Sequence, residues 1–227
     1  DAGVVHVDPR PLRERVHADD VPDVVLQTPR EADEEVPIPV VRQDFAARRP
    51  VLRSTPRFVT IGAHSACNAG CVFCQKDDLP LFSLRTYKRV IEPRMGTFLT
   101  RAEKVSFVGF GELLLMPGIE DFLAHLNRTL PDTWKIITTN GTPLTPAIAA
   151  LITEGIYSIQ VSLHASAAPL HARLTGLRTF KKVLANIGNL AALRAAHGKG
   201  KTMHLSLVSV LNTENADDMA DLVRLAA

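Results

Sequence analysis

The stretch from Trp134 to Leu163, WKIITTNGTPLTPAIAALITEGIYSIQVSL, decides the fold. It opens with a β-branched run that Asn140-Gly141 stops, and it closes with a second such run from Ile156 to Leu163. Between the two runs, Thr145-Pro146 supplies an N-cap and a first helical position for a helix over residues 147–154. Two strands joined by such a helix favour a right-handed crossover between parallel strands.

The same alternation of strand and helix extends in both directions along the chain. We predict five strands, at residues 58–61, 104–109, 134–139, 156–163 and 203–211. We predict helices from Ser83, from near Ile119, over 147–154 up to Gly155, from a Thr179 cap to Gly198, and around Met219, Leu222 and Val223. Five strand-helix units in series imply an α/β protein with a parallel sheet, either barrel-like or doubly wound. In both arrangements the chemistry belongs at the carboxyl ends of the strands.

Residues 1–56 differ from the rest of the chain. They hold eight of the fifteen prolines, which leaves no room for a long helix or a central strand. We therefore expect a proline-rich N-terminal arm, in which residues 24–26 and 36–41 could form edge strands, followed by one domain over residues 57–227.

Composition excludes several classes of protein. The 227 residues are 46% hydrophobic with three cysteines, which excludes a collagen, a disordered tail and a disulfide-rich miniprotein. No apolar run approaches the roughly 20 residues of a membrane span, and no basic-then-apolar leader is present, so we expect a cytoplasmic protein without a membrane partner. A net charge of +2 gives no general attraction to nucleic acid.

All three cysteines, Cys67, Cys71 and Cys74, fall within eight residues. An odd number at this density is a poor disulfide framework and a good metal-binding arrangement. Thiolates at Cys-x3-Cys-x2-Cys spacing can hold one cubic iron-sulfur cluster and leave its fourth iron without a protein ligand. The alternatives are a structural zinc site, with a fourth ligand such as His64, and cysteines that pack in the core.

Polar and glycine-rich residues follow every predicted strand at its carboxyl end. They are Cys67 to Cys74 after the first strand, Gly109 to Glu112 after the second, Asn140-Gly141 after the third, Ser162 and His164 after the fourth, and Asn212 after the fifth. Because these ends meet at one edge of a parallel sheet, we expect one shared site.

The sequence resembles the radical S-adenosylmethionine (radical SAM) enzymes. The resemblance rests on Cys67-Asn-Ala-Gly-Cys71-Val-Phe73-Cys74, directly after a first strand, and extends from Phe58 to the end. It implies a [4Fe-4S] cluster held by the three cysteines, with S-adenosylmethionine chelated on the open iron. One electron from the cluster would split a carbon-sulfur bond, and the resulting 5′-deoxyadenosyl radical would abstract hydrogen from a substrate.

The resemblance also implies a set of residues that bind the cofactor. Gly109-Phe110-Gly111-Glu112 looks like the family's Gly-Gly-Glu-Pro segment, which receives the methionine amino group, although Phe110 and Leu113 depart from that pattern. The complete set of expected cofactor-binding residues is Phe73, Gly109, Phe110, Gly111, Glu112, Asn140, Ser162, Arg173 and Asn212. His164 is a candidate proton carrier or substrate contact.

Simpler readings of several of these residues stay open. Asn140-Gly141 is also an ordinary turn dipeptide, and His164 could be a satisfied structural group. Arg173 could be a surface arginine near a loop, and Asn215, three residues after Asn212, could cap the last helix.

The segment around residues 162–190 resembles the branch of the family that carries C-terminal auxiliary-cluster (SPASM or twitch) domains and matures peptides or cofactors. We therefore expect an enzyme that modifies a peptide or small metabolite, with an electron donor such as flavodoxin or ferredoxin. The alternatives are an RNA-modifying radical SAM enzyme, against which the modest charge argues, and a non-catalytic iron-sulfur electron-transfer protein. Such barrels usually have six strands, so we expect these residues to form an incomplete (β/α)6 barrel.

Overall fold

The computed structural model describes residues 43, 46–48, 55–63, 66–75, 82–197 and 203–226. Its contacts divide the chain into two units, Asp1–Arg53 and Ser54–Ala227. In the first unit the described residues form one helical turn, in which the Ala47 amide donates to the Gln43 carbonyl (2.9 Å). The edge strands expected at 24–26 and 36–41 lie outside the described residues. The second unit contains the sheet and the helices that pack on it.

Five strands form one parallel sheet, which confirms the predicted α/β fold. The strands are β1 (Phe58–Gly62), β2 (Lys104–Val108), β3 (Trp134–Thr139), β4 (Tyr157–Ser162) and β5 (Met203–Val208). Every pair of neighbours is parallel, and the order across the sheet is β1-β2-β3-β4-β5. A doubly wound sheet reverses its strand order at a switch point, whereas this sheet runs in one direction. The arrangement is therefore the barrel-like one, and it is a partial barrel.

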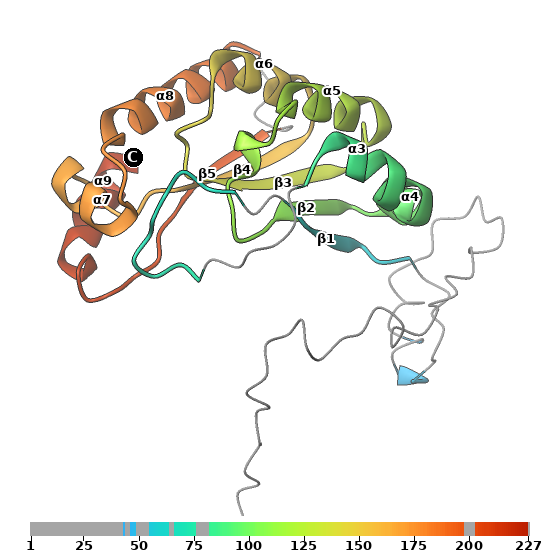
Figure 1. Cartoon of the computed structure of the whole chain (residues 1–227), viewed down its shortest axis with the longest axis horizontal. Coiled ribbons are helices and arrows are strands. Elements are labelled where there is room, and N and C mark those ends of the chain that lie inside the picture. Colours follow the sequence, from blue (N-terminus) through green and yellow to red (C-terminus); the bar gives the residue numbers. More distant parts are fainter. Residues whose placement is uncertain are drawn as a thin grey trace, which may run out of the picture. The chain divides into compact units, whose positions relative to one another are not determined.

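Helices connect successive strands. They are α3 (Leu84–Thr86), a π-helical turn (Tyr87–Ile91), α4 (Glu92–Arg101), α5 (Ile119–Thr129), α6 (Pro146–Glu154), α7 (Ala168–Thr175), α8 (Phe180–Ala196) and α9 (Met219–Ala226), with 3-10 turns at Leu113–Leu115 and Ala216–Asp218. Figure 1 shows α4, α5, α6 and α8 in a row along one face of the sheet, as a barrel wall requires. The helix expected from Ser83 is longer than predicted because α3, the π turn and α4 are continuous.

Local capping explains where some of these helices begin. The hydroxyls of Ser83 and Thr145 each accept the backbone N–H three residues on, at 3.1 and 3.2 Å, as the sequence predicts for Thr145. The prediction that Thr179 caps α8 is wrong: its side chain makes no capping hydrogen bond. Its hydroxyl instead lies 3.2 Å from that of Thr142, so a contact distant in sequence displaces the local one.

Helix α7 was not predicted, and β5 was predicted to end later than it does. The first turn of α7 contains Pro169, and Gly176 ends the helix with a φ of 71°, so both ends carry ordinary sequence signals. Strand β5 ends at Val208 rather than at residue 211. It ends early because the Val210 amide donates to the His164 ring (3.1 Å) instead of continuing the sheet.

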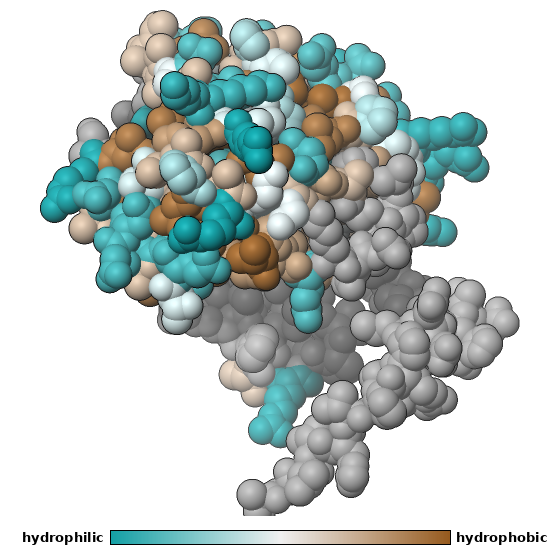
Figure 2. Space-filling model, turned by 60° about the vertical axis from the view of Figure 1, so that its left-hand side comes forward, coloured by the Kyte–Doolittle hydropathy of each residue, from teal (hydrophilic) through white to brown (hydrophobic). Residues whose placement is uncertain are grey.

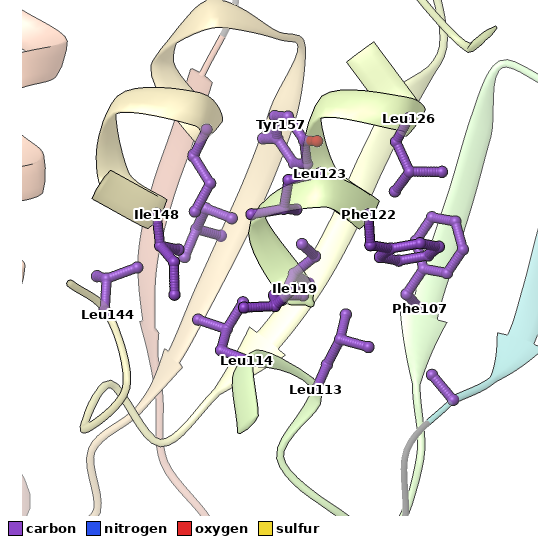
Figure 3. Packing of buried hydrophobic residues seen from close by; sticks show 14 of the residues in the cluster. Phe107, Leu113, Leu114, Ile119, Phe122, Leu123, Leu126, Leu144, Ile148 and Tyr157 are labelled. Atoms are coloured by element: carbon purple, nitrogen blue, oxygen red, sulfur yellow. The ribbon is translucent and has the colours of Figure 1, made fainter. Parts of the chain in front are cut away.

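The core lies between the sheet and the helical row. Phe122, Leu123 and Leu126, which recur at helical spacing in α5, are fully buried. Phe122 meets Phe107 of β2 edge-on, with ring centroids 5.4 Å apart. Figure 3 shows these side chains packed with Leu123 and Tyr157 between the helices and the strands. This packing fixes the strands and hence their carboxyl ends.

The surface shown in Figure 2 mixes hydrophilic and hydrophobic side chains over the described part of the chain. Among the helices that the structure describes, none is both long and apolar enough to cross a membrane.

Candidate functional site

A cavity of about 570 Å³ opens at the carboxyl ends of the strands. We call it the strand-end cavity. Its lining includes most of the residues that the sequence predicts for the site: Cys67, Cys71, Phe73, Cys74, Gly109, Phe110, Gly111, Glu112, Asn140, Ser162 and His164. The structure therefore brings together, around one hollow, residues that are spread over about a hundred positions of sequence.

The cysteine loop (residues 67–74) is held by backbone hydrogen bonds to α7. The Gly70 amide donates to the Thr175 carbonyl (2.8 Å), and the Val72 amide donates to the Leu174 carbonyl (3.0 Å). Because these acceptors lie in the last turn of a helix, they are carbonyls without a partner inside the helix. The end of α7 therefore positions the loop against the barrel.

The three thiol side chains face the strand-end cavity and form no disulfide among the described residues. Cys67 and Cys71 are half-buried and Cys74 is exposed. The Ala69 amide donates to the Cys67 sulfur (3.4 Å).

The three thiols are possible ligands of a metal centre. In the part of the chain that the structure describes, no three His, Cys, Asp or Glu side chains are close enough to hold one metal ion. Thiolates that bind different iron atoms of one cubane stand farther apart than thiolates that share one zinc. Three thiols from one loop are a donor set that fits a [4Fe-4S] cluster with one iron left open, and the possible zinc ligand His64 lies outside the described residues.

Gly109 is required by a close approach of two backbone segments. A Cβ atom at this position would lie 2.6 Å from the Ala63 carbonyl oxygen. The two segments are joined there, since the Ala63 amide donates to the Val108 carbonyl (2.8 Å). Glycine at this position thus lets the chain entering the cysteine loop lie against the end of β2.

Glu112 is almost fully buried and fastens the ends of two strands together. Its Oε1 accepts the Leu114 amide (3.1 Å), and its Oε2 accepts the Asn140 amide (2.6 Å) at the end of β3. Burial raises the pKa of this carboxyl, and hydrogen bonds from Asn140, Thr139 and Leu114 oppose the rise. A carboxylate has about four lone-pair sites, and these three hydrogen bonds leave one of them, so a fixed acceptor remains at the cavity wall.

Asn140 connects the end of β3 to the cysteine loop. Its Nδ2 donates to the side-chain oxygen of Asn68 (2.8 Å), which neighbours Cys67. Its Oδ1 accepts the Thr142 amide (2.9 Å), which is the turn chemistry that Asn-Gly predicts. Asn140 therefore both lines the cavity and holds its wall in place.

His164 supports the aromatic residue of the cysteine motif. Its ring meets Phe73 edge-on at 4.7 Å, and its Nδ1 accepts the Val210 amide (3.1 Å). This bond leaves the proton of a neutral ring on Nε2. Burial, and then the neighbouring His171, lower the pKa of His164, so the neutral form is favoured. Ser162, two residues earlier, lies half-buried in the same wall.

Arg173 and Asn212 are not among the residues that line the strand-end cavity. Arg173 is exposed and its Nε donates to Glu214 (2.7 Å). It follows the cavity-lining His171 by two positions, which on a helix is roughly the opposite face. Asn212 holds a turn instead, since its Oδ1 accepts the Glu214 amide (2.9 Å).

The alternative that Asn215 caps the last helix is wrong, because its side chain makes no capping bond. It is fully buried, and its Nδ2 donates to the carbonyls of His164 (3.0 Å) and Val210 (2.9 Å). Asn215 therefore fastens the loop after β5 to the loop after β4.

The cavity wall also contains residues that the sequence did not indicate as site residues, chiefly His171 and Thr175 of α7. His171 is 1% exposed, and neither ring nitrogen has a hydrogen-bond partner. Burial lowers the pKa of this ring, so it is neutral near pH 7. Pro169 and Gly176 are typical of the start and the end of a helix, and this pair could have predicted the helix that carries His171.

Comparison with known proteins agrees with this geometry. The profile of the Radical SAM superfamily matches residues 63–226. GTP 3′,8-cyclase of Chlorobaculum tepidum is 29% identical over 157 residues, which are 66% of this chain and 46% of that protein. The enzyme of the same name from Rhodobacter capsulatus is 29% identical over 163 residues, covering 70% of this chain and 47% of that one. The chain thus spans about half the length of the curated relatives it matches.

Solved structures share the fold. Streptococcus suis SuiB superposes with a TM-score of 0.62 at 18% identity, covering 82% of this chain and 40% of SuiB. A structure of anSMEcpe with bound AdoMet and the Cp18Cys peptide superposes with a TM-score of 0.60 at 21% identity, covering 75% of this chain and 47% of that one. At these identities the likeness shows a shared fold and nothing more.

Proposed function

Because this chain belongs to the Radical SAM superfamily, we propose that its strand-end cavity binds S-adenosylmethionine beside a [4Fe-4S] cluster and that it modifies a peptide or small metabolite by hydrogen abstraction. The chain is an enzyme of the radical SAM class, and the family's cofactors are the cluster and S-adenosylmethionine. Cys67, Cys71 and Cys74 are the proposed cluster ligands.

One observation carries this proposal. Three thiols from one loop and the polar ends of β2, β3 and β4 line the same cavity. Electron transfer requires the thiols that bind the cluster, but it does not require an adjacent cavity lined by Glu112, Asn140 and Ser162. The geometry therefore favours a site that binds a small molecule next to the cluster over the non-catalytic alternative.

The residues of the wall have separate tasks. When bound, the cluster and S-adenosylmethionine supply the one-electron chemistry that ends in hydrogen abstraction from carbon. Glu112 presents fixed carboxylate oxygens that suit an ammonium group, and Gly109 and Gly111 expose backbone at the same edge. The hydroxyl of Ser162 can donate to or accept from a carboxylate or ribose. Phe73, held by His164, excludes water from one side of the cavity.

The outer side of the cysteine loop suits an electron donor. Val72 is 62% exposed and Cys74 is also exposed, so the loop carries its cysteines to the surface. We propose that a small redox protein such as flavodoxin or ferredoxin reaches the cluster there.

Two substrate classes follow from the similar proteins. SuiB has been solved bound to its precursor peptide SuiA, which supports a peptide substrate. The curated relatives are GTP 3′,8-cyclases, which supports a purine nucleotide as the small-molecule alternative. The peptide class agrees with the resemblance of residues 162–190 to the peptide-maturing branch, and we place it first.

The test is anaerobic reconstitution with iron and sulfide, followed by reduction in the presence of S-adenosylmethionine. We expect 5′-deoxyadenosine from the wild type and none from Cys71→Ala, which should also lose the visible absorbance of the cluster. Val72→Ala, in the same loop, is the matched control and should keep both. A wild type that holds four irons and forms no 5′-deoxyadenosine, with or without substrates, would overturn the proposal.

The substrate class is tested by isotope transfer. Deuterated peptides and GTP deuterated on its ribose are offered separately, and deuterium is measured in the 5′-deoxyadenosine. Transfer from a peptide supports the first class, and transfer from GTP alone replaces it with the nucleotide class.

A further inference from the structure

His171 is a buried polar side chain with no protein partner. The residue is 1% exposed, it lines the strand-end cavity, and neither Nδ1 nor Nε2 has a hydrogen-bond partner. Buried polar groups nearly always make hydrogen bonds, because leaving one unpaired weakens the fold. A residue that carries this cost and lies in a cavity wall is expected to find its partner in the ligand.

Two other buried histidines of the described chain show the ordinary case. His125 Nε2 lies 2.9 Å from the carboxylate of Glu92, and His164 Nδ1 accepts the Val210 amide. Among these three rings, His171 alone has both nitrogens unpartnered. It is therefore the exception that needs an explanation.

The position of His171 indicates which ligand it meets. It lies in α7 one turn before Thr175, whose hydroxyl donates to the His171 carbonyl (2.7 Å). The Thr175 carbonyl in turn accepts the Gly70 amide of the cysteine loop. The imidazole lines the strand-end cavity together with the three cysteines. It also interacts with the ring of His164, which meets Phe73 of the cysteine loop edge-on. Phe180 packs against the ring at 5.5 Å and limits how far it can turn.

We propose that His171 hydrogen-bonds S-adenosylmethionine and that its ring nitrogens are satisfied only when this cofactor is bound. The inference rests on the proposed function, since it needs the cofactor in the strand-end cavity. A neutral imidazole offers one donor and one acceptor. The carboxylate and the ribose hydroxyls of S-adenosylmethionine provide matching groups. The cofactor is favoured over the substrate because the ring lines the same cavity as the three proposed cluster ligands.

If His171 serves ligand binding and not folding, its replacement should weaken ligand binding without lowering the stability of the chain. Replacing His171 with phenylalanine removes two unpaired nitrogens from the core, so the cluster-free chain should gain stability. The same change removes the contact to the cofactor, so binding should weaken. His125→Phe is the matched control, because it removes a buried ring that does have a partner. It should lose stability and leave cofactor binding unchanged.

The experiment measures both properties for each variant. Radiolabelled S-adenosylmethionine is dialysed against anaerobically reconstituted protein with the cluster left oxidised, so that no turnover occurs, and iron is counted. Melting of the cluster-free chain is followed in parallel. For His171→Phe we expect about tenfold weaker binding at equal iron content and a melting temperature about 2–6 °C higher. His171→Asn or His171→Gln, which restore a donor and an acceptor, should recover most of the affinity.

Three results would overturn the inference. Unchanged cofactor affinity in His171→Phe, beside a wild type that binds, would refute it and leave the proposed function intact. Loss of the cluster or of stability in that variant would assign His171 to support of the cysteine loop. A wild type that holds its cluster and binds no S-adenosylmethionine would refute both proposals.

Discussion

Gly109→Ala should disturb the junction between β2 and the entrance to the cysteine loop. The added Cβ would start 2.6 Å from the Ala63 carbonyl oxygen, whereas real Cβ atoms essentially never come nearer than 3.0 Å. The two backbones would have to separate by at least about 0.4 Å, against the 2.8 Å hydrogen bond that joins Ala63 to Val108. Overpacking of this kind costs about 1–3 kcal/mol, and backbone gives way less readily than a side chain.

Urea unfolding of the cluster-free chain measures this cost, and Gly62→Ala is the matched control. A Cβ at Gly62 meets nothing within 4 Å, so the control should stay within about 0.5 kcal/mol of the wild type. For a domain of this size the predicted loss in Gly109→Ala corresponds to a melting temperature lower by about 2–12 °C. Because Gly109 also lines the cavity, this variant should bind S-adenosylmethionine more weakly than the control does. Equal stability of the two variants would refute the close-approach argument.

Three further changes test other parts of the structure. Glu112→Ala leaves two backbone amides without their acceptor, so we expect the free energy of unfolding in urea to fall by about 1–3 kcal/mol per amide. Glu120→Ala, at an exposed position, is the control and should change it by about 0.5 kcal/mol or less. Gly176→Ala places a side chain at a φ of 71° and should lower the free energy of unfolding by about 1–2 kcal/mol. The control Gly188→Ala, inside α8, should raise that free energy by up to about 1 kcal/mol. Equal stability of the two variants would contradict the left-handed end of α7. Burial lowers the pKa of Lys135 to about 8 from 10.5, so between these pH values the folded chain releases a proton that the unfolded chain keeps. The contribution of Lys135 to the free energy of unfolding should therefore rise from pH 8 to 10.5. In urea unfolding at each pH, the free energy of the wild type relative to Lys135→Met should increase over this range, and a constant difference would contradict the argument.

Sequence periodicity predicted the order of the strands and helices because each of them carries local signals. Thr145-Pro146 begins α6 as expected, and the apolar face of α5 is buried where its spacing placed it. The shared site at the strand ends followed from topology alone, since the carboxyl ends of parallel strands meet at one edge. Such arguments need no knowledge of side-chain contacts.

The failures occur where a contact distant in sequence replaces a local one. Thr179 and Asn215 have side chains suited to capping, but Thr142 and the His164 carbonyl take them instead. The end of β5 depends on the His164 ring, more than forty residues earlier. His171 was missed as a site residue because its interest lies in the absence of a partner, which a sequence does not reveal.

We propose that Cys67, Cys71 and Cys74 would hold a [4Fe-4S] cluster and that S-adenosylmethionine would bind to it in the strand-end cavity. Electron paramagnetic resonance of the reconstituted, dithionite-reduced protein tests it most directly. The account predicts the signal of a reduced [4Fe-4S] cluster whose g values shift when S-adenosylmethionine is added. A cluster signal that S-adenosylmethionine leaves unchanged, at full iron content, would contradict it.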